Sequence, residues 1–284
     1  MRIIKDTNIK FMNHSRLGGF ASLLVILLGL ISLIINGGPK LSIDFKGGTL
    51  VAVNFTEPID INKIRSAMNN VIIEGQNFDF SKAEIKQFGD ESNVAIRLAR
   101  LDNEPEKFTN KIVEKLAQVY PQLVPQNKTD FVLSIEKVGP KIGAELRGDA
   151  IMAIVSALLL ILVYITIRFE LKYALGAIAA LSHDVLVTLG IFSLFGYEIS
   201  LAVIAAFLTI VGYSLNDTIV IFDRVRENAT MLKKSKLVSV INQSINDSLS
   251  RTIVTSITTF FVVLILFLFG GEVLHTFSFA MIIG

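Results

Sequence analysis

Apolar stretches long enough to cross a membrane alternate with polar stretches along this chain of 284 residues. Met1 to Arg16 is polar and basic, whereas Leu17 to Ile35 contains no charged residue. A helix of roughly nineteen residues crosses about 30 Å of hydrocarbon. We therefore predict a transmembrane helix over residues 17–36. A signal peptide is the alternative, but the apolar run is long for one and no small-residue cleavage site precedes Pro39.

Between residues 37 and 148 the pattern becomes that of a water-facing domain. Asp60 is a plausible N-terminal cap for a short helix, because a carboxylate there accepts the free N–H groups of the first turn. Neither a Ser/His/Asp set nor any other catalytic constellation is present. The element order matches the ferredoxin-like split βαβ motif. Strand, helix, strand, strand, helix and strand are expected over residues 50–55, 60–70, 82–88, 93–101, 104–120 and 130–138.

The second half of the chain predicts five more membrane helices, within residues 149–284. The last apolar run starts at Phe277 and stops at Gly284, a reach of only about 12 Å for a helix. We expect a sixth transmembrane helix that is incomplete in this sequence, with a re-entrant segment as the alternative. The predicted fold class is a membrane α-helical bundle of six transmembrane helices, with an α+β ferredoxin-like extracytoplasmic domain between helices 1 and 2. The four complete runs are residues 150–167, 173–195, 199–222 and 252–269. The loop before the last of these runs is expected to end in an amphipathic helix that continues into the span through Arg251, with Leu237, Val240, Ile241, Ile245 and Leu249 on its apolar face.

Lysine and arginine gather on one side of this topology. The basic N-terminus (1–16), the loop 168–172 and the loop 223–250 all fall on that side, whereas the connections at 196–198 and 270–272 contain no Lys or Arg. Cytoplasmic loops of membrane proteins are enriched in these residues. We expect a multi-pass protein of the bacterial cytoplasmic membrane with a cytoplasmic N-terminus.

Composition agrees with a protein in contact with the lipid bilayer. Hydrophobic residues make up 52% of the chain, charged residues 18%, and the net charge is +2, which gives no reason to expect a nucleic-acid partner. The mean hydropathy is +0.59. There is no cysteine, so disulfides and thiolate sites are excluded. His14, His183 and His275 lie far apart in the topology, so no metal site is expected.

The candidate chemistry centres on Asp217, which lies inside the fourth span. A charged side chain at mid-membrane costs at least about 2.5 kcal/mol, so we interpret Asp217 as functional. Asn216 precedes it, and Gly212 and Ala205 belong to a face of small residues on the same helix. Such faces let helices approach closely. Thr255 of the fifth span is expected to join this packing.

Two further polar groups lie near the membrane interior. His183 and Asp184 on the third span form either a proton relay or a buried hydrogen bond between helices, and both interpretations stay open. Arg251 begins the fifth span at a depth that allows it to pair with Asp217, directly or through water. As an alternative, Arg251 is an ordinary anchor at the membrane surface.

At several sites the sequence resembles the SecF family, the smaller subunits of the SecD/SecF pair of the bacterial Sec protein translocase. The resemblance covers nearly the whole chain, in the expected order. The motifs that carry it are Ile43–Thr49 (with Asp44, Gly47 and Gly48), Gly139-Pro140, His183-Asp184, Gly212–Asn228 (with Asp223 and Arg224) and Ser250–Ser256.

The resemblance implies a bundle of the resistance-nodulation-division type, completed by SecD and working beside the SecYEG channel and YajC. The family uses the proton-motive force to promote export of unfolded preprotein, without hydrolytic activity of its own or a cofactor. Within that mechanism, protonation of Asp217 would loosen its attraction to Arg251. The coupling ion is expected to be H⁺, with Na⁺ as the alternative.

Two other classes of function compete with this interpretation. A small-molecule or lipid exporter could use the same bundle, but exporters usually have large outer domains and usually two per chain. A passive scaffold for SecD would tolerate neutral residues at Asp217 and Arg251. An exporter would instead show an efflux defect with secretion unaffected.

Overall fold

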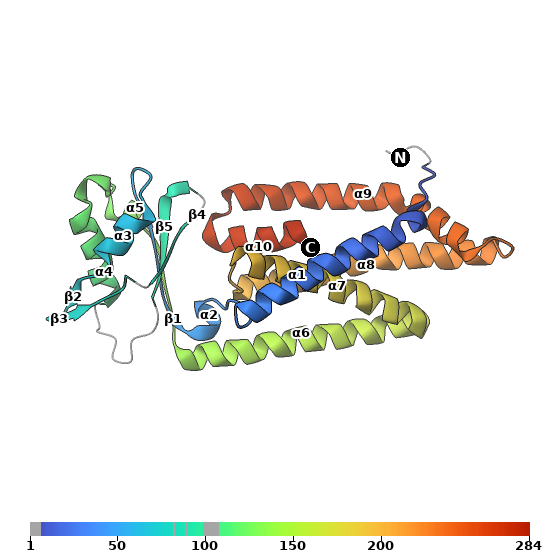
Figure 1. Ribbon diagram of the computed structural model, residues 1–284, viewed down its shortest axis with the longest axis horizontal. Helices are drawn as coiled ribbons and strands as arrows, with labels where there is room; N and C mark the ends of the chain where they lie inside the picture. Colours follow the sequence, from blue (N-terminus) through green and yellow to red (C-terminus); the bar gives the residue numbers. More distant parts are fainter. Residues whose placement is uncertain (1–6, 82, 89, 99–107) are drawn as a thin grey trace. The chain divides into compact units, whose positions relative to one another are not determined.

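The computed structural model describes residues 7–81, 83–88, 90–98 and 108–284 (Figure 1). The chain folds into two compact units. The helical unit comprises Met1–Lys40 and Met152–Gly284, and the sheet unit comprises Leu41–Ile151. Each unit is described by itself.

The helical unit contains long apolar helices that pack side by side (Figure 1). Five stretches of the described residues are long and apolar enough to cross a membrane, which identifies a multi-pass membrane protein. They are η1 with α1, and α6 to α9. The bounds are η1 (Phe11–His14), α1 (Ser15–Ile35), α6 (Pro140–Arg168), α7 (Leu171–Phe195), α8 (Leu201–Met231), α9 (Leu237–Phe269) and α10 (Gly271–Ile283).

The predicted loop 223–250 is largely helical. α8 continues past Phe222 to Met231, which was not predicted. α9 begins at Leu237 and runs without a break into the fifth span, which confirms the amphipathic helix predicted there, so only residues 232–236 connect the two helices. Polar residues end the apolar run there but not the helix, since Arg224 and Glu227 form an i,i+3 ion pair of 2.7 Å. α10 starts at Gly271, so the last helix begins before the predicted Phe277 and spans 13 residues.

α1 and α7 cross at a contact between two glycines. A Cβ built on Gly29 would lie 2.5 Å from the Cα of Gly190, so only hydrogen fits at this crossing. Close by, the Ser32 and Ser193 hydroxyls are 2.8 Å apart, and the Asn36 amide donates to Ser32 Oγ at 3.2 Å. Small residues with hydrogen-bonding hydroxyls are typical of tight helix pairs in membranes.

The sheet unit is built on four antiparallel strands in the order β4-β5-β1-β6. Val51 of β1 lies opposite Ile96 of β5 and Ile135 of β6. Asp60 caps α3 by accepting the Asn62 N–H at 2.8 Å, which confirms the predicted cap. The elements are α2 (Ile43–Lys46), β1 (Gly48–Asn54), α3 (Ile61–Ala67), β2 (Val71–Ile73), β3 (Gln76–Phe78), β4 (Glu84–Phe88), β5 (Asp90–Leu98), α4 (Phe108–Val119), η2 (Pro121–Leu123), α5 (Lys128–Phe131) and β6 (Val132–Val138).

The core of the sheet unit lies between α3, α4 and one face of the sheet. On α4, Phe108, Ile112 and Leu116 recur at helical spacing and are fully buried. They belong to the same buried cluster as Val51 of β1 and Ile96 of β5.

Three details of the sheet unit differ from the prediction or lie beyond it. The hairpin β2–β3 was not predicted; it turns through Glu74 and Gly75, both at positive φ, and its strands are only three residues long. β5 starts at Asp90, so the predicted four-residue turn before Asn93 is wrong. Residues 104–107 of the predicted second helix lie outside the described residues.

Candidate functional site

Asp217 lines a cavity of about 510 Å³ among α7, α8, α9 and α10. The side chain is partly buried. Within the described residues, no hydrogen bond or ion pair holds its carboxylate. We call this space the Asp217 cavity. Other polar residues that line the cavity include Asp184, Ser214, Thr218, Thr255, Ser256 and Thr259.

Asp184 links the third and fourth spans at the wall of this cavity. Ser214 of α8 donates a hydrogen bond to Asp184 Oδ2 at 2.6 Å, and His183 Nδ1 lies 2.9 Å from Asp184 Oδ1. The Asp184 side chain is 26% exposed. The sequence left open whether His183 and Asp184 relay protons or join two helices by a hydrogen bond. In the structure, the hydrogen bond between helices runs from Ser214 of α8 to Asp184, and His183 contacts Asp184 within α7. Asp184 also shares the cavity with Asp217, so its carboxylate lies beside the same space.

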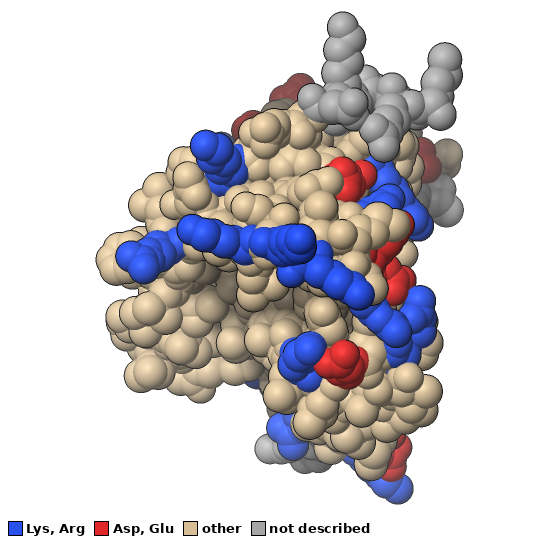
Figure 2. Space-filling model, turned by 90° about the vertical axis from the view of Figure 1, so that its right-hand side faces the viewer, with Lys and Arg blue, Asp and Glu red and all other residues tan. Residues whose placement is uncertain are grey.

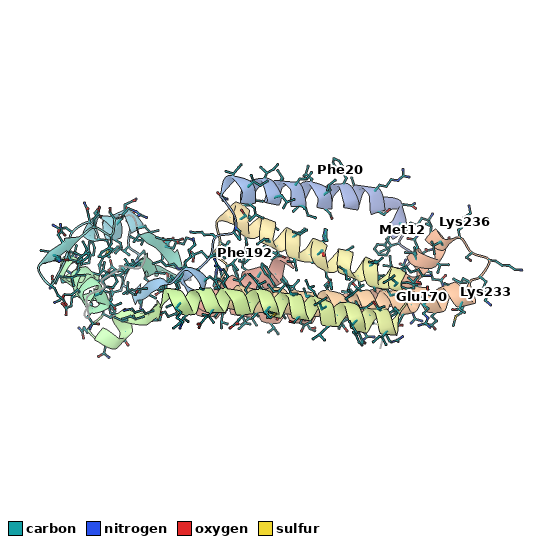
Figure 3. All side chains as sticks on the ribbon, turned by 90° about the horizontal axis from the view of Figure 1, so that it is seen from below. Met12, Phe20, Glu170, Phe192, Lys233 and Lys236 are labelled. Atoms are coloured by element: carbon teal, nitrogen blue, oxygen red, sulfur yellow. The ribbon has the colours of Figure 1, made fainter. Side chains whose placement is uncertain are left out.

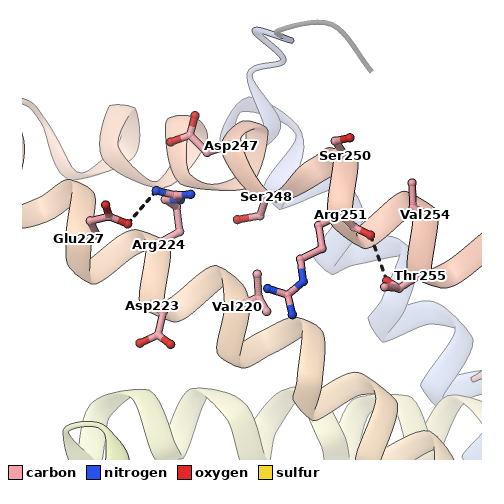
Figure 4. A pocket seen from close by; sticks show the side chains of 10 residues that line it. All are labelled: Val220, Asp223, Arg224, Glu227, Asp247, Ser248, Ser250, Arg251, Val254 and Thr255. Atoms are coloured by element: carbon pink, nitrogen blue, oxygen red, sulfur yellow. Dashed lines mark hydrogen bonds and ion pairs between the residues drawn. The ribbon is translucent and has the colours of Figure 1, made fainter. Parts of the chain in front are cut away.

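Arg251 lies on α9 and points toward Val220 of α8, one helical turn from Asp217 in the chain (Figure 4). It lines a second cavity, of about 580 Å³, which we call the Arg251 cavity. No direct ion pair joins Arg251 to Asp217 among the described residues. Thr255 lines both cavities and donates to the Arg251 carbonyl at 3.2 Å, so the two cavities adjoin at this residue.

The predicted small-residue face of α8 does not pack within this chain. Ala205, Gly212 and Asn216 are exposed, and a Cβ on Gly212 would meet no atom within 4 Å. α8 instead turns Val203, Ala206, Phe207 and Ile210 inward, because these residues lie on its other side. A packing role for Ala205, Gly212 and Thr255 stays a prediction; no helix of the described residues covers Ala205 and Gly212 of α8.

Asp223 and Arg224 make separate contacts at the end of α8. Asp223 accepts from Arg168, the last residue of α6, at 3.2 Å. Arg224 pairs with Glu227 at 2.7 Å on α8 itself. Both pairs are partly exposed, so they fix positions more than they add stability. Asp223 thereby joins the ends of α6 and α8.

The motif residues of the sheet unit shape its backbone. Ser42 caps α2 by accepting the Asp44 N–H at 3.2 Å, and Gly47 and Gly48 have φ of 74° and 137°. A Cβ on Gly48 would lie 2.7 Å from the Leu98 carbonyl oxygen, so glycine is required there. Pro140 is the first residue of α6 and follows Gly139, as expected for proline at a helix start.

Three asparagines to which the sequence assigned no role make polar contacts at one end of α8 and α9. Asn228 is 5% exposed and donates to Ser244 Oγ and Asp247 Oδ2, both at 3.0 Å. Asn242 and Asn246 bind the backbone of the N-terminal segment. Their partners are distant in sequence, so only the tendency of Asn to hydrogen-bond with backbone could have suggested them.

The same end of the helical unit is basic. Met12, Glu170, Lys233 and Lys236 lie together there, whereas Phe192 lies toward the other end (Figure 3). Viewed onto this end, lysines and arginines form a band across the surface, and acidic groups are fewer (Figure 2). The exposed basic residues of these connections are Lys10, Arg16, Arg168, Lys172, Arg226, Lys233, Lys234 and Lys236.

Chemically, the arrangement provides two carboxylates beside a cavity, with a guanidinium that points toward Val220, a residue one helical turn along α8 from Asp217. Water in such a space can bring protons to a carboxylate that no other side chain holds. Within the described residues, no cluster of three or more His, Asp or Glu side chains could hold a metal ion.

Known proteins resemble this chain over its whole length. The family model described as protein export membrane protein SecD/SecF, C-terminal, matches residues 121–284. Protein translocase subunit SecF of Calditerrivibrio nitroreducens is 43% identical over 288 residues, which cover 100% of this chain and 90% of the relative. The SecF of Rhodothermus marinus is 44% identical over 290 residues, covering 100% of this chain and 89% of the relative.

A crystal structure of SecDF from Thermus, titled a translocon-associated membrane protein, has the same fold. It superimposes with a TM-score of 0.81 at 35% identity over 98% of this chain. The chain spans only 36% of that SecDF chain. A second SecDF structure, in a super-membrane-facing form, superimposes with a TM-score of 0.66.

Proposed function

Since this chain belongs to the SecF family of protein translocase subunits, we propose that it works with SecD to promote export of unfolded preprotein, driven by the proton-motive force. The observation that carries the proposal is the Asp217 cavity, in which a carboxylate without a fixed partner lies one helical turn from the position that Arg251 faces. Asp217 is the proton-binding group of this mechanism.

The coupling step follows from the charges. When Asp217 is ionised, it attracts Arg251 and draws α9 toward α8. A proton that reaches Asp217 through the cavity removes this attraction, so the α8–α9 pair relaxes. Asp184 lines the same cavity and can accept or deliver the proton. Hydroxyl groups from α9 that line it could also bind Na⁺, so the coupling ion is H⁺ or Na⁺.

The partner in this mechanism is SecD, which packs on the exposed small-residue face of α8. Ala205, Gly212 and Asn216 offer that face without a helix of this chain upon it, which supports a partner helix there. The SecYEG channel, YajC and the translocating preprotein complete the assembly. The subunit acts as a secondary transporter component and not as a hydrolase.

In this proposal the bundle has six membrane helices, with α10 as the sixth, and the sheet unit is ferredoxin-like. The strand order β4-β5-β1-β6, with α3 and α4 as the crossing helices, supports the second assignment. The basic end of the helical unit supports a cytoplasmic N-terminus in the bacterial inner membrane.

The test is translocation into vesicles that contain the complex with SecD, under separately imposed H⁺ and Na⁺ gradients. Asp217→Asn cannot titrate, so we expect loss of gradient-stimulated translocation, while ATP-driven translocation and assembly with SecD persist. Glu170→Gln is the matched control, because Glu170 is a solvent-exposed carboxylate that pairs with Lys172 at 2.6 Å. Normal stimulation of the Asp217→Asn protein would rule out this mechanism. An Asp217→Asn defect in lipid or drug efflux alone would favour an exporter.

A further inference from the structure

The start of the chain is held on α9 by two asparagine side chains. The Ile9 N–H donates to Asn246 Oδ1 at 2.9 Å, and the Asn246 amide returns a bond to the Ile9 carbonyl at 2.9 Å. Met12 N–H donates to Asn242 Oδ1 at 2.9 Å. Asn246 thus pairs with Ile9 as a neighbouring β-strand would. We call Ile9–His14 the N-terminal strap.

α9 holds the strap and α8 through different residues of the same segment. Ser244 and Ser248 are buried, and Ser244 Oγ accepts a hydrogen bond from the Asn228 side-chain amide of α8. Asn242 and Asn246 alternate with these serines along the helix and hold the strap. The Asn246 amide also donates to the Asn242 carbonyl at 2.7 Å, which orients the side chain. A displacement of this part of α9 therefore acts on both α8 and the strap.

The strap connects the segment that carries Arg251 to the first span. Asn246 lies about 7.5 Å along α9 from Arg251. At its other end the strap joins α1, where Ser15 Oγ donates to the Met12 carbonyl at 2.9 Å. α1 in turn leads into the sheet unit through residues 36–41. Consequently α9 has a path of direct contacts and covalent bonds to the entrance of the sheet unit.

We propose that the N-terminal strap transmits displacement of the Arg251 segment of α9 to α1, with Asn246 as the positioning residue. This inference rests on the proposed role of Asp217 and Arg251. The bonds between Ile9 and Asn246 are solvent-exposed. Water can replace such bonds at little cost in stability, so breaking them frees the strap without unfolding the protein. Transmission and stability can therefore be separated by experiment.

The first measurement tests the contact itself. Hydrogen exchange is followed at the Ile9 and Met12 amides of the full chain in its complex with SecD. We expect both amides to be protected in the parent protein, and the Ile9 amide to exchange faster in Asn246→Ala. Exchange at the rate of a free peptide in the parent protein would overturn the proposal.

The second measurement compares translocation with and without a proton gradient. We expect Asn246→Ala to lower the gradient stimulation by about fivefold, the lower end of typical coupling between sites, with ATP-driven translocation unchanged. Gln243→Ala is the matched control, because Gln243 is an exposed amide on the same turn of α9. Equal stimulation in Asn246→Ala and Gln243→Ala would contradict transmission through the strap.

A covalent replacement of the contact completes the design. The chain has no cysteine, so Ile9→Cys combined with Asn246→Cys allows only one intramolecular disulfide. We expect weak stimulation in the reduced protein and recovery to the parent level after oxidation, because the disulfide restores the link. Failure to recover on oxidation would mean that Asn246 acts only within α9, and the proposal would fall. If Asp217→Asn keeps its stimulation in the same assay, the proposed function fails instead.

Discussion

At the scale of single residues, the shortest polar contact of the site joins Ser214 to Asp184 at 2.6 Å. It connects α8 to α7 at the edge of the Asp217 cavity. Hydrogen bonds between membrane helices average only about 0.6 kcal/mol, and bonds to an ionised acceptor are stronger. The contact therefore fixes the Asp184 carboxylate at the cavity wall at a modest gain in stability.

Ser214→Ala removes this bond and leaves Asp184 without its partner on α8. We expect a loss of about 1 kcal/mol, which lowers the melting temperature of the purified protein by about 2–4 °C. Thermal unfolding in detergent provides the measurement. Ser256→Ala is the control, since Ser256 lines the same cavity without a side-chain hydrogen bond to another described residue. The same melting temperature for both variants would show that the contact is absent in solution.

At the scale of the elements, α1 and α7 meet where neither helix has a side chain. The separation of 2.5 Å between a Cβ placed on Gly29 and the Cα of Gly190 leaves no room for a methyl group. The serine pair beside it holds the helices in register. This crossing attaches the first span to the helices that line the Asp217 cavity.

Gly29→Ala should force α1 and α7 apart, at a cost of about 1–3 kcal/mol for overpacking. The matched control is Gly19→Ala on the same helix, where a Cβ meets nothing within 4 Å. Because alanine favours helix more than glycine does, the control should be neutral or slightly more stable. Chemical or thermal unfolding measures the stability of the Gly29→Ala and Gly19→Ala proteins. Equal stabilities would mean that α1 and α7 do not touch at Gly29.

The sequence predicted the membrane helices well and their contacts poorly. Apolar runs such as Leu17–Ile35 predict a membrane-spanning helix, because backbone N–H and C=O groups in hydrocarbon can hydrogen-bond only with each other. The extension of α8 past Phe222 to Met231 was missed, since polar residues end an apolar run without ending a helix. Asp217 was identifiable from its cost in the membrane. Its cavity and the contact of Ile9 with Asn246 were not, because both depend on segments far apart in the chain.

At the scale of the whole molecule, the distribution of charge predicts which parts face the cytoplasm. The exposed Lys233 and Lys236 lie at the basic end of the helical unit (Figure 3). The chain has no cysteine, so a single introduced thiol reports on its own position. Lys234 and Asn77, both exposed, are suitable sites in the helical unit and the sheet unit.

A membrane-impermeant thiol reagent should label Lys234→Cys in inverted vesicles and Asn77→Cys in intact spheroplasts. The two variants act as controls for each other, because each should be protected in the preparation that exposes its counterpart. The opposite pattern of labelling would reverse the predicted topology.

The two connections between the units differ in backbone conformation. The short link after α1 contains Gly37 and Gly38, whose φ angles are 72° and 116°. Residues other than glycine rarely adopt positive φ angles. The second connection is α6, one unbroken helix of 29 residues that starts in the sheet unit and ends in the helical unit. A helix of 29 residues is about 44 Å from end to end, so the second connection has a fixed length.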